Sequence, residues 1–262
     1  MTALLKPKHI LITGASSGIG KALAEAYAAP GISLALSGRD QSRLDKVALN
    51  CQQSGAEVNV RVIDVAERAA MVQWIDETDS ARPLDLVIAN AGISAGSGGT
   101  GENEEQARNI FSINMAGVLN TLWPAINLMR RRHQGQLAII SSLVAFRGLP
   151  GAPAYSASKA AVLAYGDGLR GMLHDDGIAV SVVCPGFVES RITDANDFPM
   201  PFLMSAEKAA GIIRNGLARR KARIVFPKLM HWTIRLLAML PVALTDPVLR
   251  RAPRKIKSSP GS

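Results

Sequence analysis

Apolar segments of strand length alternate with segments of helix length from residue 9 to about residue 226. The expected strands are His9–Thr13, Ser33–Ser37, Val58–Asp64, Leu84–Ala89, Leu137–Ser141, Val180–Cys184 and Arg223–Phe226. Short apolar runs bounded by turn residues are typical of buried strands. Strands that alternate with helices predict a parallel sheet with right-handed crossovers and helices on both faces. The fold class expected is therefore α/β, with about seven strands.

Two long helices and a glycine-rich loop are predicted within this alternation. The helices span about Ala107–Met129 and Ala154–Leu173. The basic run at 130–133 closes the first helix, where cations suit the C-terminal dipole, and this explains it better than a nucleic-acid surface does. Gly92–Gly101 holds five glycines in ten residues and predicts a surface loop before the first long helix.

Composition indicates one large globular domain in a reducing compartment. The chain has 262 residues, of which 48% are hydrophobic and 19% charged. Cys51 and Cys184 form neither a disulfide framework nor a metal-ligand spacing, and the four histidines show no ligand spacing either. The N-terminal segment lacks the apolar core of a signal peptide, so we expect a cytoplasmic protein without a metal.

A glycine-rich turn follows the first expected strand. The sequence Thr13-Gly14-Ala15-Ser16-Ser17-Gly18-Ile19-Gly20 lies between this strand and a helix that runs to about Ala28. Glycines at such a turn let the backbone approach a pyrophosphate, which the helix N-terminus attracts. The spacing G-x-x-x-G-x-G at this place predicts a dinucleotide site.

Tyr155 and Lys159 form a candidate acid–base pair. They lie in an Ala-rich stretch that predicts a helix, and positions four apart on a helix share one face. A free tyrosine has a pKa near ~10, and a cation held beside it favours the phenolate. The pair therefore predicts a tyrosine whose pKa is brought toward the working range of an acid–base catalyst.

Further motifs follow the later strands. They are Asn90-Ala91-Gly92 after the fourth strand, Ser141-Ser142 after the fifth and Pro185-Gly186 after the sixth. With the glycine-rich turn and the Tyr/Lys pair, they make the chain resemble a short-chain dehydrogenase/reductase over about residues 7–226. The resemblance implies a single Rossmann-type doubly wound parallel sheet, an NAD(P) cofactor and the interconversion of alcohols and carbonyls.

The resemblance assigns cofactor-binding roles to matching positions. The pyrophosphate turn is matched by Gly14, Ser16, Ser17, Gly18, Ile19 and Gly20. The segment that bonds the adenine is matched by Asp64 and Val65, and the one at the adenine ribose by Asn90, Ala91 and Gly92. The segment beside the nicotinamide carboxamide is matched by Pro185, Gly186, Val188 and Ser190. Ser190 replaces the family's usual Thr but keeps a hydroxyl.

The end of the second strand bears on the choice between NADP and NAD. NAD-specific members of the family place an acid there that takes both ribose hydroxyls. This chain has Gly38 followed by Arg39, and a guanidinium can hold a 2′-phosphate. Asp40 comes next and weakens the argument, and a solvated loop charge is the alternative role of Arg39. NADP(H) is favoured over NAD(H).

The resemblance also implies the catalytic roles. Ser142 lies thirteen residues before Tyr155, the family's usual separation. In the reductive direction Ser142 would hydrogen-bond the carbonyl oxygen and Tyr155 would donate the proton. Lys159 would lower the pKa of Tyr155 and bond the nicotinamide ribose. Asn114 matches the residue that holds a water in a proton relay, although a buried Asn bonding the backbone explains it as well.

Two further regions bear on substrate and assembly. The segment 187–205 contains the Met- and Phe-rich run Phe198–Met204, which suits an apolar ligand or, equally, a clamp onto the domain. The family packs two long helices face to face in dimers and tetramers, so we expect a homodimer or homotetramer. Four alanines on the second long helix fit such a contact: Ala157, Ala160, Ala161 and Ala164.

The segment 227–262 follows the predicted catalytic domain 1–226 and is apolar, then basic. From Arg214 onward twelve Lys/Arg stand against a single acid, in a chain whose net charge is +9. A helix over Leu229–Leu240 would reach about 18 Å, short of a ~30 Å bilayer core, but could lie in a membrane interface. We predict peripheral contact with an anionic membrane. Packing on a partner subunit or over the substrate pocket is the alternative.

These expectations combine into one function. We expect an NADP-dependent oxidoreductase that interconverts a carbonyl and a secondary alcohol on a lipophilic substrate, with Tyr155 as acid/base. A 3-oxoacyl-thioester reductase of lipid synthesis is the alternative within the class, and a catalytically weak cofactor-sensing protein the alternative outside it. The intact set of Ser142, Tyr155, Lys159 and Asn114 argues against the sensing protein, which need not keep all four groups.

Overall fold

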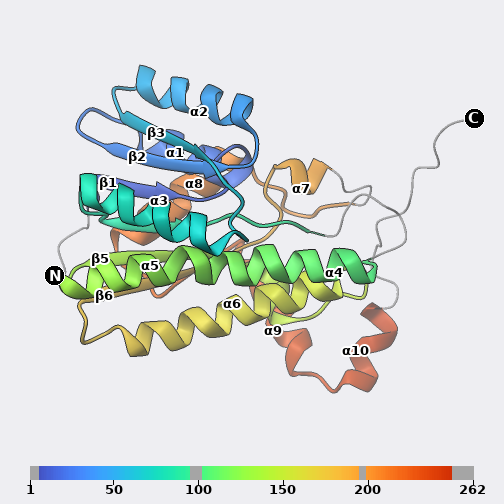
Figure 1. Cartoon of the computed structure of the whole chain (residues 1–262). Helices are drawn as coiled ribbons and strands as arrows, with labels where there is room; N and C mark the ends of the chain where they lie inside the picture. The colour runs from blue at the N-terminus through green and yellow to red at the C-terminus, as the bar shows by residue number, and fades with distance from the viewer. Residues whose placement is uncertain (1–5, 95–101, 195–198, 250–262) are drawn as a thin grey trace, which may run out of the picture.

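The seven strands form one parallel sheet. The computed structural model of the chain describes residues 6–94, 102–194 and 199–249. Its strands are β1 (His9–Ile12), β2 (Ser33–Gly38), β3 (Glu57–Val62), β4 (Leu86–Ala89), β5 (Gly135–Ile140), β6 (Ile178–Pro185) and β7 (Arg223–Phe226). They lie in the order β3-β2-β1-β4-β5-β6-β7, and all neighbours pair in parallel (Figure 1). The predicted α/β doubly wound fold is confirmed.

Helices cover both faces of the sheet (Figure 1). They are α1 (Gly18–Tyr27), α2 (Gln41–Gln53), α3 (Arg68–Ala81), α4 (Glu104–Phe111), α5 (Gly117–Arg131), α6 (Pro153–Met172), α7 (Arg191–Asp194), α8 (Ala206–Ala218), α9 (Lys228–Met239) and α10 (Val242–Leu249). Side chains of α1, α2 and α8 form one core against the sheet, and those of α3, α5 and α6 form the other.

Strand β1 contributes to both cores. Ile10 and Ile12 belong to the first core and Leu11 to the second, and all three are fully buried. A strand that is covered on both faces has no position facing water, so its sequence is a continuous apolar run. The edge strand β3 behaves differently, because only Val58 and Val60 pack against the first core.

The winding of the sheet reverses beside β1. The chain passes from β1 outward to β2 and β3 on one side, whereas β4 to β7 extend on the other side. In open α/β sheets a ligand crevice lies at the carboxyl ends of the strands at such a point. This topology brings the loops after β1 and β4 to one place, although they are far apart in the sequence.

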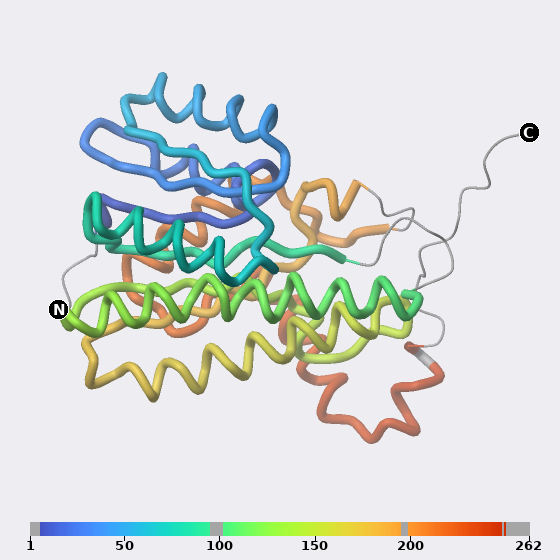
Figure 2. Tube along the Cα trace, in the orientation of Figure 1, coloured from blue at the N-terminus to red at the C-terminus, as the bar shows by residue number. Residues whose placement is uncertain are grey.

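The observed boundaries of the first six strands differ from the expected ones by one or two residues, those of β7 agree, and one expected helix is interrupted. The helix expected from Ala107 consists of α4, a π-helical turn at Ser112–Ala116, and α5, which follow one another as a continuous rod (Figure 2). It begins three residues early because Asn103 caps α4 by accepting a hydrogen bond from the Gln106 amide at 2.8 Å. Most of the predicted glycine-rich loop, residues 95–101, lies outside the described residues.

Candidate active site

The loops that follow β1, β4 and β6 meet at the carboxyl edge of the sheet. A Cβ atom added to Gly14 would lie 2.7 Å from the Cα of Ala91, after β4. A Cβ added to Gly18 would lie 2.9 Å from the Cβ of Ser190, after β6. Three segments that the sequence analysis assigned to one cofactor are therefore in contact.

The glycine-rich turn has the backbone that its glycines predict. Gly14 and Gly18 have φ angles of +66° and +52°, a region that disfavours residues with a Cβ. A Cβ on Gly20 would collide with the carbonyl oxygen of Gly14. Ser17 is the extended N-cap of α1, and the first helical turn carries no acid. The positive end of the helix dipole thus faces a cradle open to a pyrophosphate.

Asn90 holds the glycine-rich turn from the neighbouring loop. Its side-chain nitrogen donates to the carbonyl oxygens of Thr13 at 2.9 Å and Gly14 at 3.1 Å. The Thr13 hydroxyl in turn accepts from the backbone amides of Asn90 at 3.1 Å and Ala91 at 3.2 Å. Asn90 and Ala91 therefore shape the turn through direct hydrogen bonds, and their contact with the ribose stays a prediction.

The end of β2 carries an exposed arginine next to the glycine-rich turn. A Cβ on Gly38 would lie 3.3 Å from the side chain of Ser16, so the residue that ends β2 adjoins the glycine-rich turn. The Arg39 side chain is 60% exposed and lies 3.7 Å from a carboxylate oxygen of Asp64. A pair that is so exposed and so long is weak, which leaves the guanidinium free to take another anion.

Asp40 is occupied elsewhere. Its carboxylate caps α2 by accepting from the Arg43 amide at 3.0 Å, and it pairs with the Arg43 guanidinium at 3.1 Å. Asp40 weakened the sequence argument for NADP, but its carboxylate is engaged as a helix cap and its charge is compensated by Arg43. Arg43, which the sequence analysis did not single out, forms this pair with Asp40. The sequence contains a signal for this pair, because Asp40 is a typical helix-capping acid and the basic Arg43 follows it by three residues.

Val65 and Gly92 have supporting positions. Val65 is buried, and its carbonyl oxygen accepts from the Asn120 side chain at 2.9 Å. A Cβ on Gly92 would lie 3.2 Å from Oδ1 of Asn114 and 3.4 Å from Nζ of Lys159. Gly92 therefore leaves room for two of the polar groups that the sequence analysis assigned to catalysis.

Ser142 and Tyr155 meet at the crevice. Ser142 follows β5 as the extended N-cap of a short 3₁₀ turn, Leu143–Phe146, and its hydroxyl also lies 3.5 Å from the carbonyl oxygen of Pro185. Burial raises the pKa of the half-buried Tyr155, and a hydrogen bond from Ser142 offsets part of that rise. The neighbouring Ser141 instead donates to the backbone carbonyl of Lys159 at 2.8 Å.

Lys159 lies beneath the tyrosine ring. Its Nζ is 5.8 Å from the centre of the Tyr155 ring and donates to the carbonyl oxygen of Ile140 at 2.9 Å. Burial lowers the pKa of Lys159 to about 8. Burial of the phenol raises the pKa of Tyr155. The expectation that Lys159 lowers the pKa of Tyr155 stays a prediction.

Asn114 is fully buried in the π-helical turn. Its Oδ1 accepts from the Ile93 amide at 2.8 Å, and its Nδ2 donates to the Ile93 carbonyl at 2.8 Å and to the Ser158 hydroxyl at 3.0 Å. The side chain therefore fixes the loop after β4 to α6. That Asn114 binds a water molecule of a proton relay stays a prediction.

The segment after β6 closes the other side of the crevice. Val188 forms a bridge with Met204, and the Glu189 amide donates to the Met204 carbonyl at 3.0 Å. A Cβ on Gly186 would lie 2.8 Å from Pro227 and 3.3 Å from Sδ of Met230. Helix α9 thus begins directly beside the segment predicted to flank the nicotinamide.

Glu102 is a residue that the sequence analysis missed. Its carboxylate accepts hydrogen bonds from the backbone amides of Ala154 and, at 3.0 Å, Tyr155, in the first turn of α6. The two amides belong to the orphan donors of a helix N-terminus, which an anion satisfies well. No motif identifies this acid, because its partner is a backbone 53 residues away.

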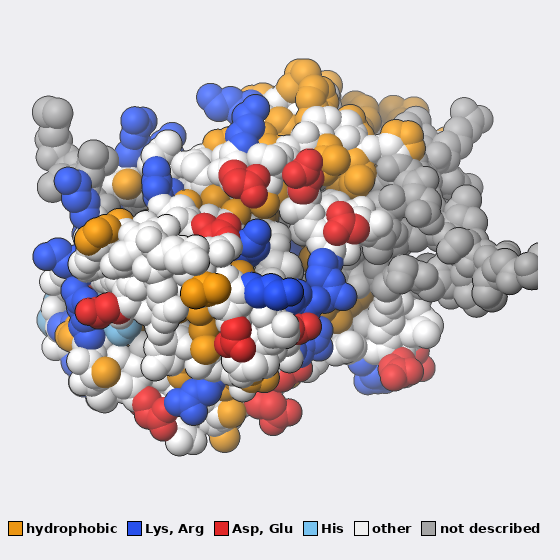
Figure 3. All heavy atoms as spheres, turned by 90° about the horizontal axis from the view of Figure 1, so that it is seen from above, with side chains coloured by type: hydrophobic (Ala, Val, Ile, Leu, Met, Phe, Trp, Pro, Cys, Tyr) orange, Lys and Arg blue, Asp and Glu red, His pale blue; other side chains and the backbone are white. Residues whose placement is uncertain are grey.

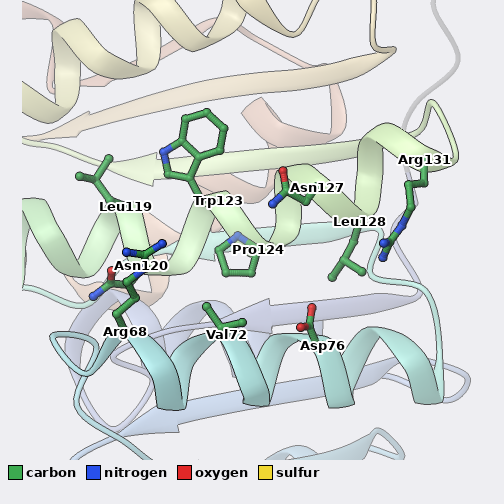
Figure 4. Close-up of a pocket in the computed structure, with 10 residues that line it drawn as sticks. All are labelled: Arg68, Val72, Asp76, Leu119, Asn120, Trp123, Pro124, Asn127, Leu128 and Arg131. Atoms are coloured by element: carbon green, nitrogen blue, oxygen red, sulfur yellow. The ribbon is translucent and has the colours of Figure 1, made fainter.

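A groove on the outer surface lies apart from the crevice. It has a volume of about 560 Å³ and runs between α3 and α5, as Figure 4 shows. Its walls include Val72 and Asp76 on α3 and Asn120, Trp123 and Asn127 on α5. None of its lining residues is a predicted site residue, so the cofactor site is not there.

Comparisons with known proteins agree with this geometry. The family model described as short chain dehydrogenase matches residues 8–198. An uncharacterized oxidoreductase of Myxococcus xanthus (strain DK1622) is 37% identical over 242 residues, which are 92% of this chain and 96% of the relative. The chain therefore belongs to the short-chain dehydrogenase/reductase family, and it is an oxidoreductase of the NAD(P)-dependent type that acts on CH–OH or C=O groups.

Two solved structures of the family contain nicotinamide cofactors. A short-chain dehydrogenase/reductase from Burkholderia phymatum in complex with NAD is 25% identical, with a TM-score of 0.80 over 97% of this chain and 98% of that chain. A short-chain dehydrogenase from Sphingobium yanoikuyae in complex with NADPH is 25% identical, with a TM-score of 0.77 over 96% and 98%. The tight turn at Gly14, Gly18 and Gly20, where an added Cβ would collide with the neighbouring loops or with the turn itself, fits such a cofactor.

Proposed function

We propose that the chain is an NADP-preferring carbonyl reductase or alcohol dehydrogenase for a lipophilic substrate. The observation that carries this proposal is the position of the Lys159 ammonium 5.8 Å from the centre of the Tyr155 ring, with the Ser142 hydroxyl close enough to lower the pKa of the phenol. Two hydroxyls that converge at the ligand-binding edge of an α/β sheet suit a carbonyl oxygen.

The protonation states support catalysis in the reductive direction. Burial keeps the Tyr155 phenol protonated, so it can donate a proton to the alkoxide that forms from the carbonyl. The Ser142 hydroxyl would donate a second hydrogen bond to the same oxygen. The Lys159 ammonium would compensate the phenolate left behind, because the two charges attract in a poorly hydrated site. The nicotinamide cofactor supplies the hydride when bound.

The residues at the end of β2 support NADP over NAD. Gly38 offers no carboxylate to the ribose hydroxyls, and Arg39 is held only by a long, exposed pair with Asp64. The carboxylate of Asp40 is engaged as the cap of α2 and paired with Arg43, so it does not compete for Arg39. A guanidinium beside the predicted ribose suits a 2′-phosphate.

Apolar side chains around the crevice support a lipophilic substrate. Leu143 is buried directly after Ser142, and Met230 from α9 packs on the same cluster. Phe202 and Leu203 in the segment after β6 are exposed, and they precede Met204, which pairs with Val188. Large flexible apolar groups suit an aliphatic ligand better than a charged one. A 3-oxoacyl thioester is the alternative within this class.

A turnover screen with the full-length chain tests this proposal. Oxidation of NADPH and of NADH would be followed with keto-lipids, long aliphatic aldehydes and 3-oxoacyl thioesters. Tyr155→Phe removes the proton donor but keeps the ring, so we expect turnover to fall by roughly 10²–10⁴-fold while NADPH binding persists. Near-normal turnover of Tyr155→Phe would contradict the mechanism. Absence of turnover with all three classes, with NADPH still bound, would favour a cofactor-sensing protein.

A further inference from the structure

Helices α9 and α10 present an apolar surface to solvent. The side chains of Leu229, Trp232, Leu236 and Met239 are between 63% and 80% exposed, and α9 contains no buried residue. Their spacing of three and four residues places them on one side of the helix. Val242 and Leu244 of α10 are exposed as well. We call these six residues the α9–α10 face.

The contacts of both helices hold this face outward. Met230 and Ile234, on the other side of α9, pack against the cluster around Leu143. The His231 ring lies 4.7 Å from the ring of Phe146. Helix α10 is tied to the loop after β5 because the Arg147 guanidinium donates to the Thr245 hydroxyl at 2.6 Å. An ordinary surface helix turns its polar side to water, whereas α9 turns a continuous apolar stripe outward.

Positive charge surrounds the α9–α10 face. Lys228 and Arg235 border the stripe on α9, which has no acidic residue. Asp246, the single acid after Arg214, is paired with Arg147 at 3.5 Å. The sequence then adds Arg250, Arg251, Arg254, Lys255 and Lys257, which lie outside the described residues. The body differs, because acidic and basic side chains are interspersed on the face shown in Figure 3.

We propose that the α9–α10 face docks on an anionic lipid bilayer. An apolar stripe with a tryptophan and a border of cations has the pattern of a helix lying in a membrane interface. Each nearby Lys or Arg is attracted to an anionic leaflet. A second copy of the chain suits this face less, since a symmetric contact would bring like charges together. No helix among the described residues is long and apolar enough to span a bilayer.

Docking would place the crevice close to the lipid. Met230 lies on α9 one residue from Leu229 and is the neighbour of Gly186 in the segment predicted to flank the nicotinamide. Residues of α10 and of the first turns of α6, which carries Tyr155, line one common pocket. A substrate dissolved in the bilayer would therefore meet the active site without crossing bulk water. This last step rests on the proposed lipophilic substrate, whereas the docking itself does not.

Vesicle sedimentation with the full-length chain tests the docking. Vesicles of phosphatidylglycerol mixed with phosphatidylcholine would be compared with vesicles of phosphatidylcholine alone, at low and high salt. We expect sedimentation with the anionic vesicles and at least about tenfold weaker partitioning at high salt. The double variant Leu229→Gln/Leu236→Gln should lose at least about tenfold in partitioning. Leu49→Gln on α2 is the matched control, because Leu49 is an exposed leucine far from this face.

Each outcome decides the docking. A chain that stays in the supernatant with anionic vesicles at low salt overturns it. Equal partitioning of the wild type and the Leu229→Gln/Leu236→Gln variant also overturns it, since charge alone would then hold the protein. A third result is that the wild type fails to bind vesicles while the Leu229→Gln/Leu236→Gln variant has a smaller molar mass in solution than the wild type. That result would show that the α9–α10 face binds a second copy of the chain and would overturn the docking. Turnover of a water-soluble carbonyl, measured on the same samples, separates failure of docking from failure of the proposed enzyme activity.

Discussion

The protonation of Lys159 sets a pH limit on the proposed reaction. Burial lowers the pKa of Lys159 to about 8, so the ammonium is present below that pH and is lost above it. Burial raises the pKa of Tyr155, so the phenol keeps its proton across the same range. We expect kcat/KM for carbonyl reduction to be level below about pH 8 and to fall above it.

A conservative variant tests whether the fall in kcat/KM above about pH 8 comes from Lys159. Lys159→Arg carries a cation that stays protonated at every pH of interest, so its residual reductive activity should show no fall near pH 8. The measurement is the pH profile of kcat/KM for wild type and variant with one carbonyl substrate. An inflection that persists unchanged in Lys159→Arg would belong to another group.

Glu102 acts on the catalytic residue through the backbone. Its carboxylate accepts from the amides of Ala154 and Tyr155, so it fixes the first turn of α6 that carries the phenol. In Glu102→Gln one oxygen is replaced by a donor that faces a backbone N–H. We expect a loss of about 1–2 kcal/mol in the free energy of unfolding and a lower kcat, with NADPH affinity unchanged.

The matched control for Glu102 is Glu104→Gln. Glu104 lies two residues away but forms only an exposed pair with Arg108 on α4. Such a pair contributes little, so neither stability nor kcat should change. If Glu102→Gln and Glu104→Gln have the same kcat, the carboxylate of Glu102 does not position Tyr155.

At the scale of the elements, the proposed preference for NADP depends on the junction of β2 and α2. Arg39→Ala should weaken NADPH by about 1–3 kcal/mol and leave NADH nearly unchanged, because only NADPH carries the 2′-phosphate. Gly38→Asp should shift the preference toward NADH by restoring a carboxylate to the ribose. Arg61→Ala is the control, since Arg61 pairs with Glu77 on the edge of the sheet. Equal losses of both cofactors in Arg39→Ala would make Arg39 structural.

The strands of the sheet could be predicted from the sequence because the pattern of apolar residues within each strand determines where it lies. Ile10, Leu11 and Ile12 are buried on both faces, and so they form an uninterrupted apolar run that predicts a central parallel strand. The glycines of the turn after β1 were equally readable, since their φ angles exclude most other residues. The interruption between α4 and α5 was not, because a π-helical turn has no composition of its own.

Contacts between distant backbones account for what the sequence did not predict. The Glu102 carboxylate accepts a hydrogen bond from a backbone amide 53 residues away. The side-chain amide of Asn114 forms hydrogen bonds with the backbone of Ile93 and the hydroxyl of Ser158. The pKa of Tyr155 depends on how deeply the phenol is buried, which no spacing of Tyr and Lys encodes. Motifs therefore predicted which residues gather at the crevice, whereas their electrostatics required the packing.

At the scale of the whole molecule, the outer surface of α6 has the small residues expected of the predicted contact between subunits. Small side chains at Ala157, Ala164, Gly168 and Gly171 are exposed and recur every three to seven residues along the helix. A Cβ added to either glycine would meet no atom within 4 Å. A flat stripe of small residues lets another helix approach closely, as expected of the face-to-face helix packing predicted from the sequence. On neighbouring helices, Phe111 and Trp123 are exposed, and Trp123 points away from α3 (Figure 4).

One substitution on this stripe tests the assembly. Ala164→Arg places a long charged side chain on an exposed helical position, so the subunit should fold normally while the helix contact is blocked. We expect the molar mass measured by light scattering to fall from that of a dimer or tetramer toward a smaller species. Gln53→Arg on the exposed surface of α2 adds the same charge elsewhere and should leave the mass unchanged. If Ala164→Arg has the wild-type mass, α6 is not the contact, and the oligomer must form through another surface.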